Sequence, residues 1–149
     1  MNDEYFMNQA IALAKEAAEE GEVPVGAVVV LDGKIVGAGR NRREISKNAL
    51  AHAEIEAINE ACRALGGWRL WQCDMYVTLE PCPMCTGAII NSRMKRLVYG
   101  ASDYKAGSCG SVIDLFSLPY NHKPEVAKGV MQEECAALLT DFFKKLRKK

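Results

Sequence analysis

The fold-deciding stretch is residues 24–40, PVGAVVVLDGKIVGAGR. Its valine-rich first part, Val25–Val30, is too short for a helix and suits a buried strand. Asp32-Gly33 is a strong hairpin signal, so residues 34–41 are expected to return antiparallel beside the first strand. This segment therefore predicts the first two strands of a sheet.

Two glycines in the returning strand, Gly37 and Gly39, weaken it as a strand and predict either a bulge or a close backbone approach. Amphipathic helices are expected on both sides of the hairpin, at residues 4–20 and about 52–65. The residues at core spacing in the second helix are Ile55, Ile58, Cys62 and Leu65. A polar loop, residues 42–48, is expected between the hairpin and that helix.

The remaining elements alternate between strands and helices. We expect strands at 75–79, 97–101 and 126–130, helices at 83–92 and 132–147, and a loop at 102–124 with one helical turn near Val112–Leu115. The last helix is predicted to bury Cys135, Leu138, Leu139, Phe142, Phe143 and Leu146. Because a helix joins the third and fourth strands, those strands should be parallel. The order predicts a three-layer α/β domain with a mixed sheet.

The composition excludes several classes of protein. A chain of 149 residues, 49% hydrophobic and 26% charged, can bury a core and is neither disordered nor a membrane protein. No repeat or domain boundary is evident, so a single domain over residues 1–149 is expected. The first four residues, MNDE, are acidic where a secretory signal would be basic and then apolar. A cytoplasmic location is therefore expected.

The formal net charge is zero, but the charges are unevenly distributed. Residues 1–60 hold 11 acidic and 6 basic residues, whereas residues 61–149 hold 8 acidic and 13 basic residues. Five bases occupy the last six positions: Lys144, Lys145, Arg147, Lys148 and Lys149. A solvated helix end explains this run, because cations suit a helix C-terminus. The charge alone therefore does not indicate an RNA partner.

Two short segments carry the candidate chemistry: His52-Ala53-Glu54 and Pro81-Cys82-Pro83-Met84-Cys85. Each begins a predicted helix. Cys82 and Cys85 are three apart, so they lie on one helix face and can hold one ion. The positive end of the helix dipole also favours their thiolate forms. With His52 they make three protein ligands.

Three ligands rather than four favour a catalytic metal site. Structural zinc sites are normally closed by four side chains, while catalytic sites leave a position for water. Zinc makes that water reactive at neutral pH, and Glu54 could carry its proton. His52 and Glu54 converge only if the helix begins between them or Glu54 bends back. His122 as a fourth ligand, and a redox role for the Cys-x-x-Cys pair, stay open at this point.

Together the two segments resemble the signature of the zinc-dependent nucleobase deaminases. The resemblance implies a cytidine deaminase-like α/β/α fold with a mixed five-stranded sheet. It also implies that His52, Cys82 and Cys85 bind one Zn²⁺ per subunit and that Glu54 shuttles protons. Segments 24–28 and 40–42 resemble the pocket-forming segments of the family, in which Asn41 would contact the base.

Later segments resemble the bacterial tRNA adenosine deaminases in particular. They are residues 100–107, 110–111, 121–123, 134–139 and 142–143, and the likeness covers about residues 3 to 147, with Tyr104 as a departure. The resemblance implies a homodimer that receives the flipped-out wobble adenosine of a tRNA anticodon stem-loop. Its candidate contacts to neighbouring nucleotides are Asp103, Lys105, Asn121, His122 and the basic C-terminus.

Two other functions compete with this one. A deaminase of free guanine, cytosine or a nucleotide would share the whole metal centre. The loop after the fourth strand, segment 121–123 and the basic last helix count against it. A non-catalytic RNA-binding module with a structural zinc would instead need a fourth protein ligand and no role for Glu54.

Overall fold

The computed structural model describes residues 2–148. Its five strands form one mixed sheet in the order β2-β1-β3-β4-β5. The strands are β1 (Gly26–Leu31), β2 (Lys34–Arg40), β3 (Asp74–Leu79), β4 (Arg96–Ala101) and β5 (Glu125–Lys128). β1 pairs antiparallel with β2 and β3, and β4 pairs parallel with β3 and β5. The predicted mixed sheet, with its parallel crossover through a helix, is confirmed.

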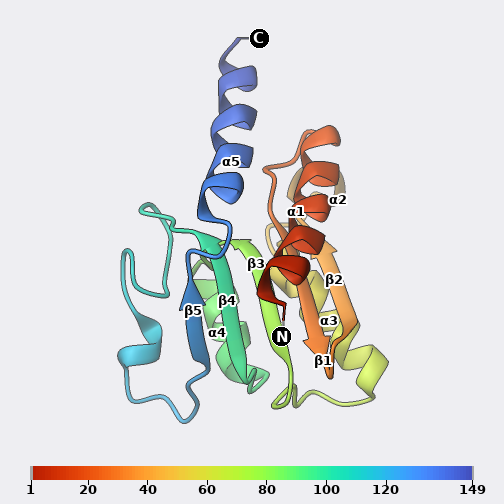
Figure 1. Ribbon diagram of the computed structural model, residues 1–149, viewed down its shortest axis with the longest axis vertical. Coiled ribbons are helices and arrows are strands. Elements are labelled where there is room, and N and C mark those ends of the chain that lie inside the picture. The colour runs from red at the N-terminus through yellow and green to blue at the C-terminus, as the bar shows by residue number, and fades with distance from the viewer. Residues whose placement is uncertain (1, 149) are drawn as a thin grey trace.

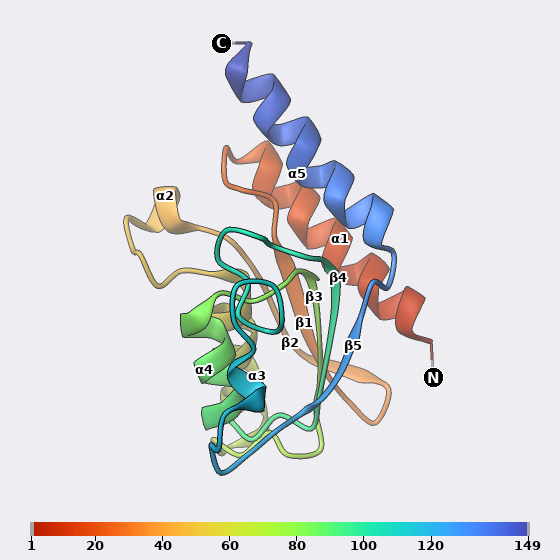
Figure 2. The ribbon, with the colours of Figure 1, turned by 90° about the vertical axis from the view of Figure 1, so that its left-hand side faces the viewer.

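Helices cover both faces of this sheet. They are α1 (Asp3–Glu19), α2 (Arg43–Ser46), α3 (Ala53–Leu65), α4 (Pro83–Asn91) and α5 (Gln132–Arg147), with a 3₁₀ turn, η1, at Leu115–Ser117. α1 and α5 lie on one face, and α3 and α4 lie on the other (Figures 1 and 2). This is the predicted three-layer arrangement. Within residues 2–148, no helix is long and apolar enough to cross a bilayer.

The hairpin has the geometry that its turn residues require. Asp32 and Gly33 both have positive φ, 50° and 78°, as a two-residue turn of type I′ demands. The register slips between Val29 and Val30, so the predicted bulge is present. The close backbone approach is present as well, because a Cβ on Gly39 would lie 2.4 Å from the carbonyl oxygen of Ala53 in α3.

That close approach decides which face of α3 is buried. The face against the sheet is made of small residues, Ala53, Ala57 and Ala61, all fully buried. The predicted core positions were partly wrong: Ile58 is buried, but Ile55 and Cys62 are half-buried and Leu65 is exposed. Alanines facing strand glycines let α3 lie directly on β2, which turns the larger side chains outward.

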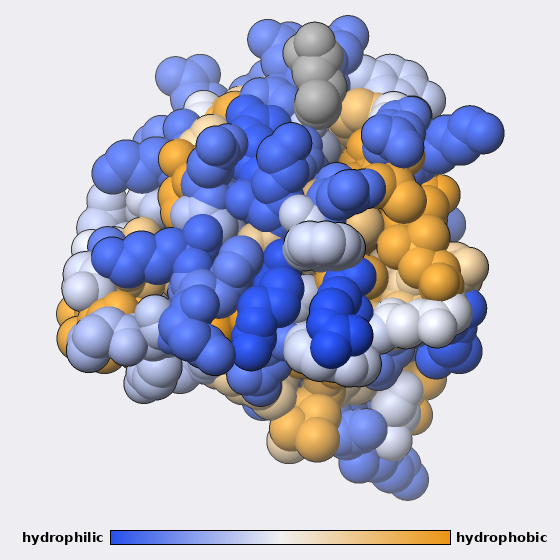
Figure 3. Space-filling view, turned by 90° about the horizontal axis from the view of Figure 1, so that it is seen from below, coloured by the Kyte–Doolittle hydropathy of each residue, from blue (hydrophilic) through white to orange (hydrophobic). Residues whose placement is uncertain are grey.

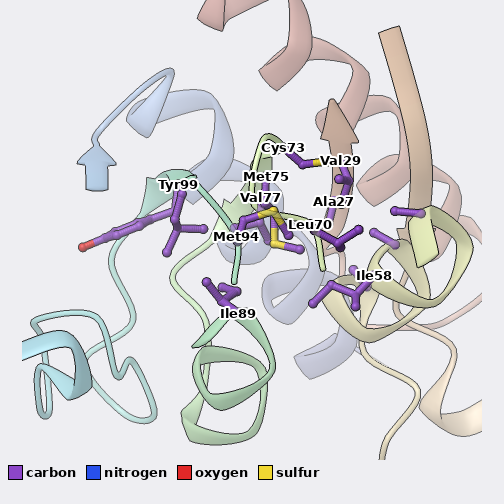
Figure 4. Close-up of a cluster of buried hydrophobic side chains, with 14 of the residues drawn as sticks. Ala27, Val29, Ile58, Leu70, Cys73, Met75, Val77, Ile89, Met94 and Tyr99 are labelled. Atoms are coloured by element: carbon purple, nitrogen blue, oxygen red, sulfur yellow. The ribbon is translucent and has the colours of Figure 1, made fainter. Parts of the chain in front are cut away.

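The larger of the two cores fills the space between the sheet and helices α3 and α4. Figure 4 labels its central members, among them Met75 and Val77 from β3, Ile89 from α4, and Leu70 and Met94 from connecting segments. These side chains are fully buried. The packing fixes the starts of α3 and α4 against the sheet, which places the candidate chemistry.

Three local predictions need correction. The polar loop 42–48 contains a helical turn, α2, because the buried carboxylate of Glu22 accepts hydrogen bonds from the backbone N–H groups of Glu44 and Ile45. The expected turn at Val112–Leu115 lies slightly later, as η1. In α5 only Cys135 is buried, because the helix runs past the end of the sheet and its last turns project from the body (Figure 1).

Candidate active site

The candidate ligands lie where two helices begin, at the same end of the sheet: α3 follows the carboxyl end of β2, and α4 follows that of β3. His52 is the N-cap of α3 and Cys82 the N-cap of α4, and both have extended backbone, with ψ of 151° and 176°. Helix α3 therefore begins at Ala53, between His52 and Glu54. This break in the helical geometry is the condition under which His52 and Glu54 can serve the same site.

The three predicted ligands do come together. His52 Nδ1 lies 3.7 Å from Cys82 Sγ and 3.6 Å from Cys85 Sγ. A tetrahedral zinc ion at normal bond lengths separates a nitrogen and a sulfur ligand by about 3.6 Å. All three ligand atoms lie within 4.8 Å of one another. The donor set and its spacing fit one zinc ion without rearrangement.

No fourth side chain of the described residues joins this cluster. His122, the candidate left open above, lies elsewhere: its Nε2 is 2.6 Å from the carbonyl oxygen of Met94, before the start of β4. The cluster thus has the three-ligand form of a catalytic site rather than the closed form of a structural one.

The thiols and the imidazole perturb one another strongly. The hydrogen bond from Cys85 lowers the pKa of the Cys82 thiol to about 4, against the effect of burial, and the hydrogen bond with His52 adds to it. The same contact with Cys82 raises the pKa of His52. The pKa of Cys85 rises, because Cys85 supplies the proton of the hydrogen bond to Cys82. The lowered pKa of Cys82 favours its thiolate, the form that binds a cation.

Glu54 is a buried carboxyl group beside the ligands. It is 4% exposed, and this burial raises its pKa to about 7. A carboxyl group with a pKa near the working pH can both accept and release a proton. Glu54 therefore has the environment of a general acid–base group rather than that of an ordinary first-turn glutamate.

His52, Glu54 and Cys82 open onto a cavity of about 190 Å³. It is lined by Val23, Val25, Asn41, Arg43, His52, Glu54, Leu79, Glu80, Cys82, Asp103 and Ala106. The predicted residues Asn41 and Asp103 are among them. Asn41 Oδ1 accepts a hydrogen bond from the backbone N–H of Ala53 at 2.9 Å, so its NH₂ group is left to donate. The cavity is smaller than a typical drug-sized pocket and suits a single base.

Not every predicted contact residue reaches this cavity. Lys105 is exposed beside the lining residues Asp103 and Ala106, so it lies at the rim. Asn121 and His122 lie at the opposite end of the sheet, near the start of β4. Figure 3 shows the molecule from that end: its surface is mostly hydrophilic, with separate hydrophobic patches. Within one chain, these two residues do not belong to the pocket.

Two buried glutamates next to the cavity were missed by the sequence reasoning. Glu22 holds the start of α2, and Glu80 accepts hydrogen bonds from the loop after β4. Burial by itself raises the pKa of Glu80, but the hydrogen bonds from Ser111, Asp103 and Cys109 hold it below its usual value. The acidic residue between a strand and Pro81-Cys82 was the signal available in the sequence.

Known proteins resemble this chain in sequence and in fold. A family model described as MafB19-like deaminase matches residues 1–147. A tRNA-specific adenosine deaminase of Bacillus subtilis (strain 168) is 50% identical over 148 residues, covering 99% of this chain and 92% of that protein. The chain belongs to the tRNA-specific adenosine deaminase family.

Solved structures agree with this membership. One, from a study of A-to-I editing by tRNA:A34 deaminases at the wobble position of transfer RNA, superimposes on this member with a TM-score of 0.88 at 46% identity. It covers 91% of this chain and 99% of its own. A guanine deaminase from Bacillus subtilis is more distant, with a TM-score of 0.68 at 34% identity, over 100% of this chain and 96% of its own. The fold is shared across the superfamily, and the stronger likeness is to the tRNA enzymes.

Proposed function

We propose that this protein converts adenosine to inosine at the wobble position of a tRNA anticodon. The observation that carries the proposal is the three-ligand cluster of His52, Cys82 and Cys85 beside the buried Glu54, in a cavity of about 190 Å³. Family membership supports adenosine in tRNA as the substrate, because the B. subtilis relative is a tRNA-specific adenosine deaminase.

We propose one zinc ion per subunit, held by His52, Cys82 and Cys85. The nitrogen–sulfur distances and the lowered pKa of Cys82 support zinc, which prefers nitrogen and sulfur ligands. When bound, zinc supplies Lewis-acid activation of water at neutral pH.

Glu54 then serves as the proton carrier. The reaction joins the oxygen of water to C6 of adenine and breaks the bond from C6 to the exocyclic nitrogen, which leaves as ammonia. One proton of the water must reach the base before ammonia departs, and the buried Glu54 can accept it and pass it on. Asn41, with its NH₂ free to donate, would orient the base.

The surroundings of the target base remain a prediction. Asp103 and Lys105 lie in and beside the cavity and are proposed to contact the neighbouring nucleotides. The same role for the basic end of α5 is supported by its position, because a second hollow of about 350 Å³ runs from Asn41 and Arg43 to Phe142 and Phe143 of α5. Asn121 and His122 would have to touch RNA outside this pocket.

We also propose a homodimer, formed through the outward face of α3 and α4. Its support is an apolar hollow of about 300 Å³ whose lining includes Ile55, Ile58, Cys62, Trp68 and Ala88. Trp68, in this lining, is 50% exposed. A large apolar side chain stabilises a protein when it is buried, so an exposed tryptophan in an apolar hollow supports a contact surface. A cytoplasmic location remains proposed, because a tRNA substrate and thiolate ligands both belong in a reducing compartment.

The test is deamination of an anticodon stem-loop RNA with a wobble adenosine, run beside free adenosine, cytidine and guanine. Conversion of the stem-loop to the inosine form, with slow or no turnover of the free compounds, is the expected result. Turnover of guanine with an inert stem-loop would move the protein to the guanine deaminases, whose fold it shares.

A further inference from the structure

Glu80 is a buried carboxylate at the site for which the proposed chemistry has no use. It follows β3 directly, precedes Pro81 and the ligand Cys82, and is 1% exposed. It also lines the cavity that holds Glu54. Burying a carboxylate costs several kcal/mol unless its oxygens are paired, so its partners indicate what it does.

All four hydrogen bonds to Glu80 come from one segment, residues 103–111. Oε1 accepts from the backbone N–H of Asp103 at 3.0 Å and from the hydroxyl of Ser111 at 2.5 Å. Oε2 accepts from the backbone N–H groups of Cys109 at 3.0 Å and Ser111 at 3.1 Å. Both carboxylate oxygens therefore face the loop. The side chain of Glu80 binds the start of the loop at Asp103 and its end at Cys109 and Ser111.

Residues 105–107 of this loop are held by Asp103, the residue whose backbone Glu80 binds. The side chain of Asp103 accepts hydrogen bonds from the backbone N–H groups of Lys105 at 3.0 Å and Ala106 at 3.2 Å. The backbone N–H of Gly107 donates to the carbonyl oxygen of Asp103 at 2.8 Å. Other contacts hold the far part of the loop, where the backbone N–H of Ser108 donates to the carbonyl oxygen of Pro81 at 2.9 Å and Cys109 forms a bridge with Asp114. The rim residues at 103–106 are held by the side chain of Asp103, whose own backbone N–H is held by Glu80.

The loop and the carboxylate are also fitted sterically. A Cβ on Gly107 would lie 2.4 Å from the Cδ atom of Glu80, so only glycine allows the loop backbone to pack against the carboxyl group. An apolar residue in place of Glu80 would avoid the cost of burying charge, but it would leave three backbone N–H groups without their acceptor.

We propose that Glu80 is a positioning residue that holds the loop 103–111 in the shape that receives the RNA around the target base. This inference rests on the proposed function. Because Glu80 acts through the rim residues Asp103 and Lys105 and not on the reacting atoms, it sets the KM for RNA more than kcat.

The test compares Glu80→Gln with the wild type on the anticodon stem-loop. Glutamine has the same shape, but its NH₂ group must face backbone N–H donors, so one end of the loop loses its acceptor. We expect KM to rise about tenfold, which corresponds to one buried donor left unsatisfied. The kcat should stay within about threefold of the wild type, and the zinc content should be unchanged.

Two matched variants and a second readout complete the design. Ser111→Ala removes one hydroxyl donor and leaves the three backbone donors, so it should fold normally and raise KM less than Glu80→Gln. Glu125→Gln makes the same chemical change at an exposed position on β5 and should match the wild type. Amide hydrogen exchange should become faster in residues 103–111 for Glu80→Gln only.

A double-variant comparison separates positioning from simple stabilisation. If Glu80 acts through the loop, Lys105→Ala should raise KM less in the Glu80→Gln background than in the wild type. Three results for Glu80→Gln would each overturn the proposal. They are an unchanged KM, a decrease in kcat alone, and loss of zinc from part of the protein while the zinc-bound remainder has normal kinetics. If the wild type itself proves inert on RNA, the proposed function fails, and unchanged loop exchange in Glu80→Gln would separately overturn the anchoring.

Discussion

Glu54, Cys82 and His52 show how position changes the chemistry of ordinary side chains. Glu54 would titrate near 4.5 in water, but burial raises its pKa to about 7. The thiol of Cys82 moves the other way, to a pKa of about 4, through its hydrogen bonds with Cys85 and His52. Opposite pKa shifts in neighbouring side chains are typical of sites that bind a cation and transfer a proton at neutral pH.

Replacing Glu54 should therefore separate catalysis from metal binding. Glu54→Gln should lower kcat by at least about 10²-fold, because the proton carrier is lost, while zinc stays at one ion per chain. Cys82→Ser should lose the zinc as well as the activity. Stem-loop turnover and zinc content by atomic absorption measure both effects. Glu60→Gln, exposed on the same helix, is the control; zinc loss in Glu54→Gln would contradict the assignment.

Beside the two apolar cores, a few polar and steric contacts fix how the helices lie on the sheet. Asp3 in α1 accepts hydrogen bonds from the guanidinium of Arg96 in β4, at 2.8 and 3.0 Å, and from the hydroxyl of Tyr76 in β3, at 2.6 Å. On the other face, α3 lies against the backbone of β2 at Gly39. The Asp3 contact joins the start of α1 to β3 and β4, beside the apolar core on that face. The Gly39 contact sets the distance between β2 and the helix that carries Glu54.

The Asp3 contact predicts a pH-dependent stability. The hydrogen bond from Arg96 lowers the pKa of Asp3, so its carboxylate stabilises the fold at pH values above the unfolded pKa, and this contribution is lost as pH falls through the lower folded pKa. Asp3→Asn should cost about 1–3 kcal/mol at pH 7 and less at pH 3, which lies below the unfolded pKa. Urea denaturation at both pH values measures this difference. Glu4→Gln, exposed in the same helical turn, should change little, and an equal cost of Asp3→Asn at both pH values would exclude the ionic contribution.

Gly39 predicts a steric effect on the site. A methyl group there would meet the carbonyl oxygen of Ala53 at 2.4 Å and push α3 away from β2. Gly39→Ala should lower the free energy of unfolding by about 1–3 kcal/mol and reduce activity in the remaining folded protein. Gly87→Ala in α4 has open space around its new Cβ and should be neutral or stabilising. Thermal unfolding measures the stability of the two variants, and kcat measures their activity. Equal losses of stability and activity in Gly39→Ala and Gly87→Ala would refute the packing argument.

The whole molecule leaves apolar side chains of α3 and the following segment uncovered. Exposed groups near this face include Leu65 and Trp68, and the half-buried Ile55 lines the hollow beside them. Contiguous exposed apolar side chains of this kind mark interaction surfaces, and in the proposed dimer a second copy of the chain covers them.

Charging this face should separate the subunits. Ile55→Glu should shift the sedimentation of the protein from dimer to monomer, because a carboxylate would be buried in the apolar contact. Ile35→Glu, at a partly exposed isoleucine on the edge strand β2, should leave the assembly unchanged. Analytical ultracentrifugation distinguishes the two. A wild-type protein that sediments as a monomer at all concentrations would refute the dimer.

The sequence by itself determined what depends on neighbours along the chain. The hairpin follows from Asp32-Gly33, and the ligand pair follows from the spacing of Cys82 and Cys85. Only the tertiary structure decided which side of α3 is buried, that Glu80 meets residues 103–111, and that His122 lies far from the pocket. Those outcomes depend on the distance between elements, which small residues such as Gly39 and Ala53 set through packing and which local spacing does not encode.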